Sequence, residues 1–559
     1  MQNGTMKLKD LFNGDRIFNI PKYQRAYAWK DDDNLEPFLD DLIHQRGEKS
    51  YFLGTFLFHQ KDTRGEYEII DVVDGQQRLT TIIIFIKVII QLLTTQNSKK
   101  ISKKTFSRYI YDGENYKLEQ ENEDSGFLHN YIFENKKLLN YETTSQRRLI
   151  EAKTFFEKHL SKLDINEQEH IFDILVNSDV IVYIVDKISD ATQIFELLND
   201  RGRKLTKLEG VKSFLMYRIG CLKLKDNGEQ STNLIQDSFA SIYREVEKFN
   251  INENDVLRYH TIAFERSKSD DYNSADKFIK DKINLLFEKE TDDNKIKNEI
   301  LNYTKRLGNS FKIFAEIKNN NIKCSKYNDL LMIGRVNPFY PLMLKVYAQE
   351  QEEFSNFIET LVRFTFRASI ISLRSNGETD FYKWIRNDEF ISSDINIPID
   401  NNWWNLNKRV EEVLEYKDFY NWVSKNITKY ILFSYENYLR KIKGYPLLTK
   451  ENYFSNDNKE KLNLEHITAQ RVKNIKFDDD FKENYLHSLG NLVIDTTSSN
   501  SRKNNKNVNE KMGEFIKAPI MSQNEINEDK IDWENIDEIK IFIDKRNNKI
   551  IKFIKSEIL

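Results

Sequence analysis

Residues 71–78 read Asp-Val-Val-Asp-Gly-Gln-Gln-Arg, a polar turn that separates two apolar segments. The segment before it, residues 67–73, has the β-branched composition of a strand, and residues 79–93 after it form a longer apolar run. We therefore expect a strand, a tight turn and a helix that begins near Gln77. Further strand-like segments at 51–59 and 180–186 predict an α/β unit in this part of the chain.

The turn has the features of an anion-binding site. The start of a helix directs free backbone N–H groups and the positive end of the helix dipole outward, and Gly75 would let a phosphate approach the backbone. Arg78 adds a planar, permanently charged fork, and the carboxylates of Asp71 and Asp74 could hold Mg²⁺ beside the phosphates. No Gly in the chain is followed by Lys, so a Walker-type P-loop is excluded. The alternative is an ordinary solvated Asp-Gly turn.

Two further segments favour a functional turn. Residues 20–29 read Ile-Pro-Lys-Tyr-Gln-Arg-Ala-Tyr-Ala-Trp, and residues 199–205 read Asn-Asp-Arg-Gly-Arg-Lys-Leu. Each alone could be a structural turn. Together with Phe-Leu-Gly-Thr at 52–55 and Asp-Gly-Gln-Gln-Arg-Leu-Thr-Thr at 74–81, their order and spacing resemble the N-terminal domain of GmrSD-type modification-dependent restriction endonucleases.

The resemblance implies a domain over residues 1–215 that is similar to the ParB/sulfiredoxin fold. In the family this domain binds and hydrolyses a nucleoside triphosphate, which would be GTP or another nucleotide. Carried over to this sequence, the nucleotide-binding residues would be Gln24, Arg25, Asp74, Gly75, Gln76, Gln77, Arg78, Asn199 and Arg201.

Composition fits a large protein of several domains. The 559 residues include 39% hydrophobic residues, and 85 basic and 88 acidic residues give a net charge of −3, so any nucleic-acid surface must be local. Cys221 and Cys324 are isolated, which argues against a zinc finger or a disulfide framework and suits a reducing cytoplasm. The start of the chain lacks a signal-peptide core, and the apolar run 82–93 is short and broken by Lys87. We expect a cytoplasmic chain with no membrane partner.

Beyond the first domain the pattern is helical. Residues 96–150 look like a helical insertion, and residues 216–445 like a helical connecting domain with few Gly and Pro and many aromatics at helical spacing. The whole chain is therefore predicted to be α+β and predominantly helical. Most of the tryptophans in the connecting domain are expected to pack in cores: Trp384, Trp403, Trp404 and Trp422. Three arginines could face DNA or nucleotide, although a satisfied or solvated helix face is favoured for them: Arg363, Arg367 and Arg374.

A second constellation follows in residues 446–559, where two strand-like segments, a loop and a helix carry His and Asn in a ββα-metal arrangement. A neutral His466 could take a proton from water that attacks a phosphodiester, and Asn491 would brace the loop that orients the imidazole. Glu465, Asn500 and Asn504 could hold Mg²⁺ or another divalent cation against the scissile phosphate. The alternative is a lone His beside an acid and an Asn-rich solvated loop.

A second resemblance favours the catalytic interpretation. The segments Leu-Glu-His-Ile-x-x-Gln, Leu-Gly-Asn-Leu and Asn-Ser followed by Lys, within residues 455–515, resemble the HNH nuclease domain of the same proteins. Ala469 stands where the family commonly has proline, and the asparagines from 500 to 509 leave the third HNH position open. Lys503 and Lys506 are placed to meet DNA phosphates, whereas His487 is expected to be a packed or surface residue.

The two resemblances imply a nucleotide-dependent endodeoxyribonuclease of phage defence. Its HNH domain would cut double-stranded, modified phage DNA under the control of the N-terminal NTPase. Two alternatives stay open: a nucleotide-gated regulatory protein with a non-cleaving HNH domain, and a nickase that acts through the N-terminal domain. The nucleotide, the modification and the oligomeric state, for which a homodimer is one alternative, are not set by the sequence.

Overall fold

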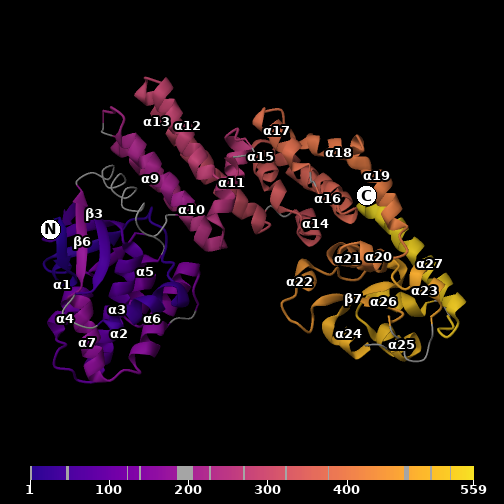
Figure 1. Ribbon diagram of the computed structural model, residues 1–559, viewed down its shortest axis with the longest axis horizontal. Coiled ribbons are helices and arrows are strands. Elements are labelled where there is room, and N and C mark those ends of the chain that lie inside the picture. Colours follow the sequence, from indigo (N-terminus) through magenta and orange to yellow (C-terminus); the bar gives the residue numbers. More distant parts are fainter. Residues whose placement is uncertain are drawn as a thin grey trace. The chain divides into compact units, whose positions relative to one another are not determined.

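The computed structural model describes residues 3–45, 50–121, 124–137, 140–185, 206–225, 228–268, 271–321, 324–374, 377–470, 477–503, 506–528 and 531–559. The chain forms two compact units, which are shown in Figure 1: a first unit of Met1–Thr261 with Ser267–Asn319, and a second unit of Ile262–Arg266 with Asn320–Leu559. The helices expected in one connecting domain are thus divided between the two units. The division into three domains stays a prediction.

The first unit is built on a mixed sheet. Its described residues form six strands: β1 (Gly4–Lys7), β2 (Arg16–Ile20), β3 (Phe52–Arg64), β4 (Tyr67–Asp74), β5 (Leu118–Gln120) and β6 (Asp179–Val185). They lie in the order β1-β6-β3-β4-β2-β5. The pairs β1–β6 and β3–β4 are antiparallel, whereas β3–β6, β2–β4 and β2–β5 are parallel. The strands expected at 51–59 and 67–73 are therefore confirmed, and the strand expected at 180–186 is confirmed over its described residues, 180–185.

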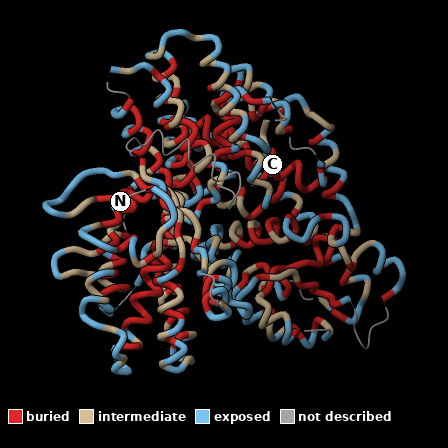
Figure 2. Tube along the Cα trace, turned by 60° about the vertical axis from the view of Figure 1, so that its left-hand side comes forward, coloured by how far each residue is buried: buried red, intermediate tan, exposed pale blue. Residues whose placement is uncertain are grey.

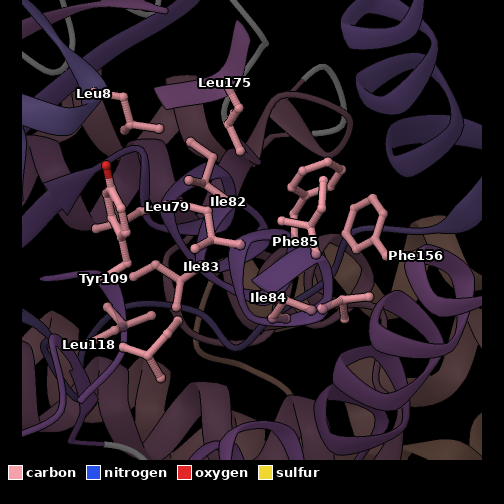
Figure 3. Packing of buried hydrophobic residues seen from close by; sticks show 14 of the residues in the cluster. Leu8, Leu79, Ile82, Ile83, Ile84, Phe85, Tyr109, Leu118, Phe156 and Leu175 are labelled. Atoms are coloured by element: carbon pink, nitrogen blue, oxygen red, sulfur yellow. The ribbon is translucent and has the colours of Figure 1, made fainter. Parts of the chain in front are cut away.

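Helix α3 (Gln76–Thr95) follows β4 after a single residue and forms the centre of the core. It packs on α6 (Thr144–Leu160) and α7 (Ile165–Val176), and the rings of Phe85 and Phe156 lie 5.1 Å apart (Figure 3). The length and composition of α3 alone would allow it to cross a membrane, because the helix extends beyond the apolar run 82–93. However, 72% of the most apolar 18-residue stretch of α3 is buried inside the protein, as in core helices of soluble proteins.

The predicted helical insertion is only partly helical. It contains α4 (Lys103–Tyr109), α5 (Ser125–Phe127) and the start of α6, but also β5, which pairs with β2 at the edge of the sheet. The remaining helices that lie in or begin in the first unit are α1 (Leu8–Leu11), α2 (Glu36–His44), α9 (Lys207–Gly220), α10 (Glu229–Phe249), α11 (Glu253–Phe264), α12 (Ala275–Lys289) and α13 (Asp293–Lys318).

The second unit begins with helices and ends with a small strand pair among further helices. The first group of helices is α14 (Ser325–Ile333), α15 (Tyr340–Gln349), α16 (Phe354–Ile370), α17 (Glu378–Arg386), α18 (Ile397–Asp400), α19 (Leu406–Leu414), α20 (Phe419–Trp422), α21 (Lys425–Lys443) and α22 (Lys450–Tyr453). The elements that follow are β7 (Leu462–His466), α23 (Asp479–Asn484), β8 (Leu492–Thr496), α24 (Thr497–Lys503), α25 (Val508–Lys517), α26 (Met521–Asn524) and α27 (Ile536–Phe553). β7 and β8 pair antiparallel, with His466 opposite Leu492.

The tube in Figure 2 shows buried stretches running through the helices and strands, while exposed residues concentrate in connecting segments. Trp384 and Trp403 pack on each other, with ring centroids 5.9 Å apart, but both are only half-buried and neither lies in a core as expected. Trp422 is 69% exposed. Arg367 is buried and donates from Nη2 to the carbonyl oxygen of Leu559 at 2.6 Å, so its charge is satisfied within the protein, which is one of the two outcomes favoured for it.

Candidate functional sites

The turn between β4 and α3 depends on Gly75. This residue has a φ of +89° and precedes the first residue of the helix. A Cβ atom here would lie 2.5 Å from the ring of Phe56, so both the backbone conformation and the space favour glycine. The sharp turn brings Asp74 and the first turn of α3 together, as the sequence predicts.

Glutamine side chains tie the segment 20–29 to this turn. Nε2 of Gln24 donates to the carbonyl of Val73 at 2.7 Å, and Nε2 of Gln76 donates to the carbonyl of Arg25 at 3.0 Å. Gln77 donates from Nε2 to the carbonyl of Ala26 and accepts at Oε1 from a backbone N–H of the same segment. The structure therefore brings the motifs at 20–29 and 74–81 together. The amide groups of these glutamines hydrogen-bond to protein backbone.

Arg78 is anchored as well. Its Nη1 donates to the carbonyl of Thr55 at 3.0 Å, and its guanidinium lies 5.6 Å from the centre of the Phe56 ring. Burial lowers the pKa of Arg78, and the carboxylate of Asp74 opposes that shift. Gly54 has a φ of +103°, which favours glycine, and a Cβ atom there would also lie 2.6 Å from Nη1 of Arg78.

The two carboxylates expected at a shared Mg²⁺ have different surroundings. Asp71 accepts a hydrogen bond from Nδ2 of Asn19 at 2.6 Å and lies 3.8 Å from Nζ of Lys61. For Asp74, burial raises the pKa, while the N–H of Gly75 and the charge of Arg78 lower it. Asp74 is thus the carboxylate that accompanies Arg78 at the start of the helix.

The segment 20–29 also contacts α9, through Glu209 and Lys212, which belong to none of the predicted motifs. Nε of Arg25 lies 3.7 Å from Oε1 of Glu209, and Nζ of Lys212 donates to the carbonyl of Tyr23 at 3.0 Å. The ammonium of Lys212 lies between the rings of Tyr23 and Tyr243, and burial lowers its pKa to about 8. The only signal in the sequence was a lysine on an otherwise apolar helix face.

A cavity of about 270 Å³ lies beside this segment. Gln24 lines it from the motif, and Tyr243, Arg244 and Glu247 line it from α10. Burial raises the pKa of Glu247 to about 7, with the charge of Asp124 acting in the same direction. The remaining predicted nucleotide-binding residues, Asn199 and Arg201, lie outside the described residues.

In the second unit His466 ends β7 and is buried, with 7% of its surface exposed. Burial lowers its pKa to about 3, and the charges of His487, Lys425 and Lys511 act in the same direction. The imidazole is therefore neutral at physiological pH, which is the form that a general base requires. Its Nε2 is buried and makes no hydrogen bond within the described structure.

Aromatic rings cover His466. The ring of Tyr420 on α20 meets the imidazole edge to face at 4.6 Å between centroids, and the ring of His487 lies 5.4 Å away. The N–H of Tyr420 donates to the carbonyl of His487 at 2.9 Å, so the two covering residues are linked. No motif in the sequence indicated that a residue from the helical region would contact this histidine.

Asn491 is fully buried and braces the backbone that follows His466. Its Oδ1 accepts from the N–H of Thr468 at 3.0 Å, and its Nδ2 donates to the carbonyl of Leu486 at 2.8 Å. The carbonyl of Asn491 also accepts from the N–H of Ile467 at 2.9 Å. These contacts correspond to the bracing role that we expected for this side chain.

The expected metal ligands lie along β7 and α24. Glu465 is buried, and its Oε1 lies 2.7 Å from Nζ of Lys511. Asn500 lies against the same strand, with Nδ2 at 3.4 Å from the carbonyl of Leu464, and Asn504 falls outside the described residues. The described chain has no cluster of three His, Cys, Asp or Glu suited to a metal ion. One carboxylate and one amide oxygen beside a single strand nevertheless suit a hard divalent cation that keeps several waters.

The expectation for Lys503 is wrong. It is fully buried, and its Nζ lies 2.9 Å from Oδ2 of Asp495 and 2.6 Å from Oε1 of Gln523. A buried ammonium requires such partners, and it cannot meet a DNA phosphate from this position.

Both candidate sites lie in segments that match known protein families. Residues 8–216 match the family described as GmrSD restriction endonuclease, N-terminal domain, and residues 404–553 match GmrSD restriction endonucleases, C-terminal domain. These matches place the chain in the class of restriction endonucleases, which act in phage defence and have DNA as their substrate. The chain belongs to the GmrSD family, which confirms the resemblance of its motifs. No curated protein matches the chain.

Proposed function

We propose that the C-terminal site is an HNH nuclease site and that His466 is its general base. The observation that carries the proposal is a neutral imidazole on a braced strand end, beside the carboxylate of Glu465 on the same strand and the amide of Asn500 on α24, which contacts that strand. Nε2 of His466 would take a proton from water as the water oxygen bonds to phosphorus and the bond to the leaving sugar oxygen breaks. A divalent cation, Mg²⁺ or another, would be held by Glu465 and Asn500 and would neutralise charge on the phosphate.

His466→Ala tests this proposal. Loss of a general base costs about 10² to 10⁴ in rate, so cleavage of modified duplex DNA with Mg²⁺ or Mn²⁺ should fall by that factor. His170→Ala, at an exposed position on α7, is the matched control and should cut like the wild type. Full activity of His466→Ala would overturn the HNH assignment, and nicking that survives in this variant would favour catalysis by the N-terminal domain.

For the first unit we propose nucleoside triphosphate binding and hydrolysis at the start of α3. The proposal is supported by the arginine and carboxylate that the turn brings together, and by Arg25 on the segment tied to that turn. The backbone N–H groups of the first helical turn would meet phosphate, and Arg78 would add charge. We further propose that this site controls cleavage and that modified phage DNA is the preferred substrate.

Arg78→Ala should weaken binding of GTP or ATP about tenfold or more, because hydrogen bonds to charged groups contribute about 1.5–3 kcal/mol. Arg78→Lys keeps a positive charge and should lose less. Calorimetry with each nucleotide in the presence of Mg²⁺ measures both variants, and unfolding curves establish that they remain folded. Equal affinity in the wild type and in Arg78→Ala, or no binding by the wild type, would mean that the turn is structural.

A further inference from the structure

One buried lysine contacts both the proposed metal ligand Glu465 and the proposed general base His466. Lys511 lies on α25 and has no exposed surface. Its Nζ lies 2.7 Å from Oε1 of Glu465 and donates to the carbonyl of His466 at 3.3 Å. A single ammonium therefore fixes the side chain of the proposed metal ligand and the backbone of the proposed base.

The helix that carries Lys511 is itself held in place. Asn507 and Glu510 form a capping box at the start of α25, and Val508 and Phe515 are buried in the hydrophobic cluster of this part of the unit. Lys511 therefore links a helix that is capped and packed in this cluster to the end of β7.

The same region offers a matched control. Lys503 is also fully buried and also pairs with a carboxylate, Asp495, at 2.9 Å. Its described hydrogen bonds go to Asp495 and Gln523, not to Glu465 or His466. Removing either ammonium leaves one buried carboxylate without its cation, so the damage to folding should be similar. Only the loss of Lys511 should disturb Glu465 and His466 directly.

We propose that Lys511 is a positioning residue of the nuclease site: it occupies Oε1 of Glu465, leaves Oε2 to a divalent cation and fixes the strand end that carries the imidazole. This inference rests on the proposed function of the C-terminal site. The ammonium of Lys511 also places a positive charge next to Glu465, the proposed cation ligand. Removal of that charge should strengthen cation binding while the site loses its geometry.

The test compares Lys511→Met with Lys503→Met in the full chain. Lys511→Met should lower kcat for DNA cleavage at saturating Mn²⁺ by about tenfold or more, because small displacements of catalytic groups are costly, with KM little changed. Mn²⁺ alone, followed by its electron paramagnetic resonance signal without DNA, should bind several-fold more tightly. Lys503→Met should leave kcat unchanged and should strengthen Mn²⁺ binding less than Lys511→Met does, because the charge of Lys503 also acts on Glu465 but without a hydrogen bond to it. The two thermal midpoints should fall to a similar extent.

A second pair keeps the test decisive if the methionine variants do not fold. Lys511→Arg and Lys503→Arg both retain the charge, and only the first should slow cleavage, since a guanidinium cannot reproduce the contacts of the ammonium. Equal kcat and equal Mn²⁺ affinity within the folded pair would overturn the inference. Failure of the proposed function is separate, because it would appear as full activity of His466→Ala.

Discussion

Several lysines of this protein are buried, although lysine as a residue type predicts exposure. Lysine is among the residues least often fully buried, yet Lys87, Lys212, Lys503 and Lys511 all lie inside the protein. Each contacts an oxygen from a side chain or backbone carbonyl. In three of the four cases the partner is distant in sequence or lies on another element, so only the fold brings it to the lysine. Without knowledge of these partners, the sequence predicts that such lysines lie on the surface. This is why Lys503 was wrongly expected to meet DNA.

Lys87 should make the stability of the protein depend on pH. Burial lowers its pKa from 10.5 to about 8, and repulsion by Lys153 adds to the shift. Between pH 8 and 10.5 the unfolded chain binds more protons than the folded one, so this lysine makes stability rise with pH across that window. Lys87→Met should therefore stabilise the protein at pH 7, by up to about 3 kcal/mol, and the gain should shrink toward pH 10.5.

Thermal unfolding at pH 7 and pH 10 measures this difference directly. Lys99→Met, at an exposed position after the end of α3, serves as the control and should shift neither midpoint. The account of Lys87 is contradicted if the midpoints of wild type and Lys87→Met differ by the same amount at both pH values.

Elements with a strong local pattern were predictable from the sequence, and those fixed by distant partners were not. Strand β4 and helix α3 follow from their apolar runs and the turn at Gly75 between them. β5 was missed because it has three residues and exists through pairing with β2. In the candidate sites the motifs indicated which segments come together, but not that Gln24, Gln76 and Gln77 would hydrogen-bond to protein backbone.

Helix α20 gives the clearest functional consequence at this scale. Its Tyr420 packs on His466, and Nε2 of that imidazole is buried without a hydrogen-bond partner among the described residues. We therefore expect that Tyr420 must move before water reaches the base. An aromatic contact is worth about 0.5–1.5 kcal/mol, so Tyr420→Ala should raise the population of open sites, and the basal cleavage rate, about two- to tenfold.

The basal rate is measured on modified duplex DNA without nucleotide. Trp422→Ala removes an exposed aromatic from the same helix and should leave that rate unchanged. If Tyr420→Ala instead cuts more slowly than the wild type, Tyr420 supports the imidazole and does not cover it.

At the scale of the whole molecule the two proposed chemistries belong to different compact units. The turn of β4 and α3 lies in the first unit, and His466 lies in the second. A nuclease in a host cell must be restrained, and this chain joins the N-terminal and C-terminal GmrSD domains. We expect the nucleotide to bias the nuclease through a conformational equilibrium, which requires that it bind the two conformations with different affinity.

The most direct test of this central claim is the rate of DNA cleavage by the wild type and by Arg78→Ala, each with and without GTP or ATP. The account predicts that nucleotide changes the wild-type rate about tenfold, within the usual range of allosteric coupling, whereas Arg78→Ala keeps a basal rate that nucleotide does not alter. Cutting by both proteins at one common rate under every nucleotide condition would contradict the claim that the first unit controls the second.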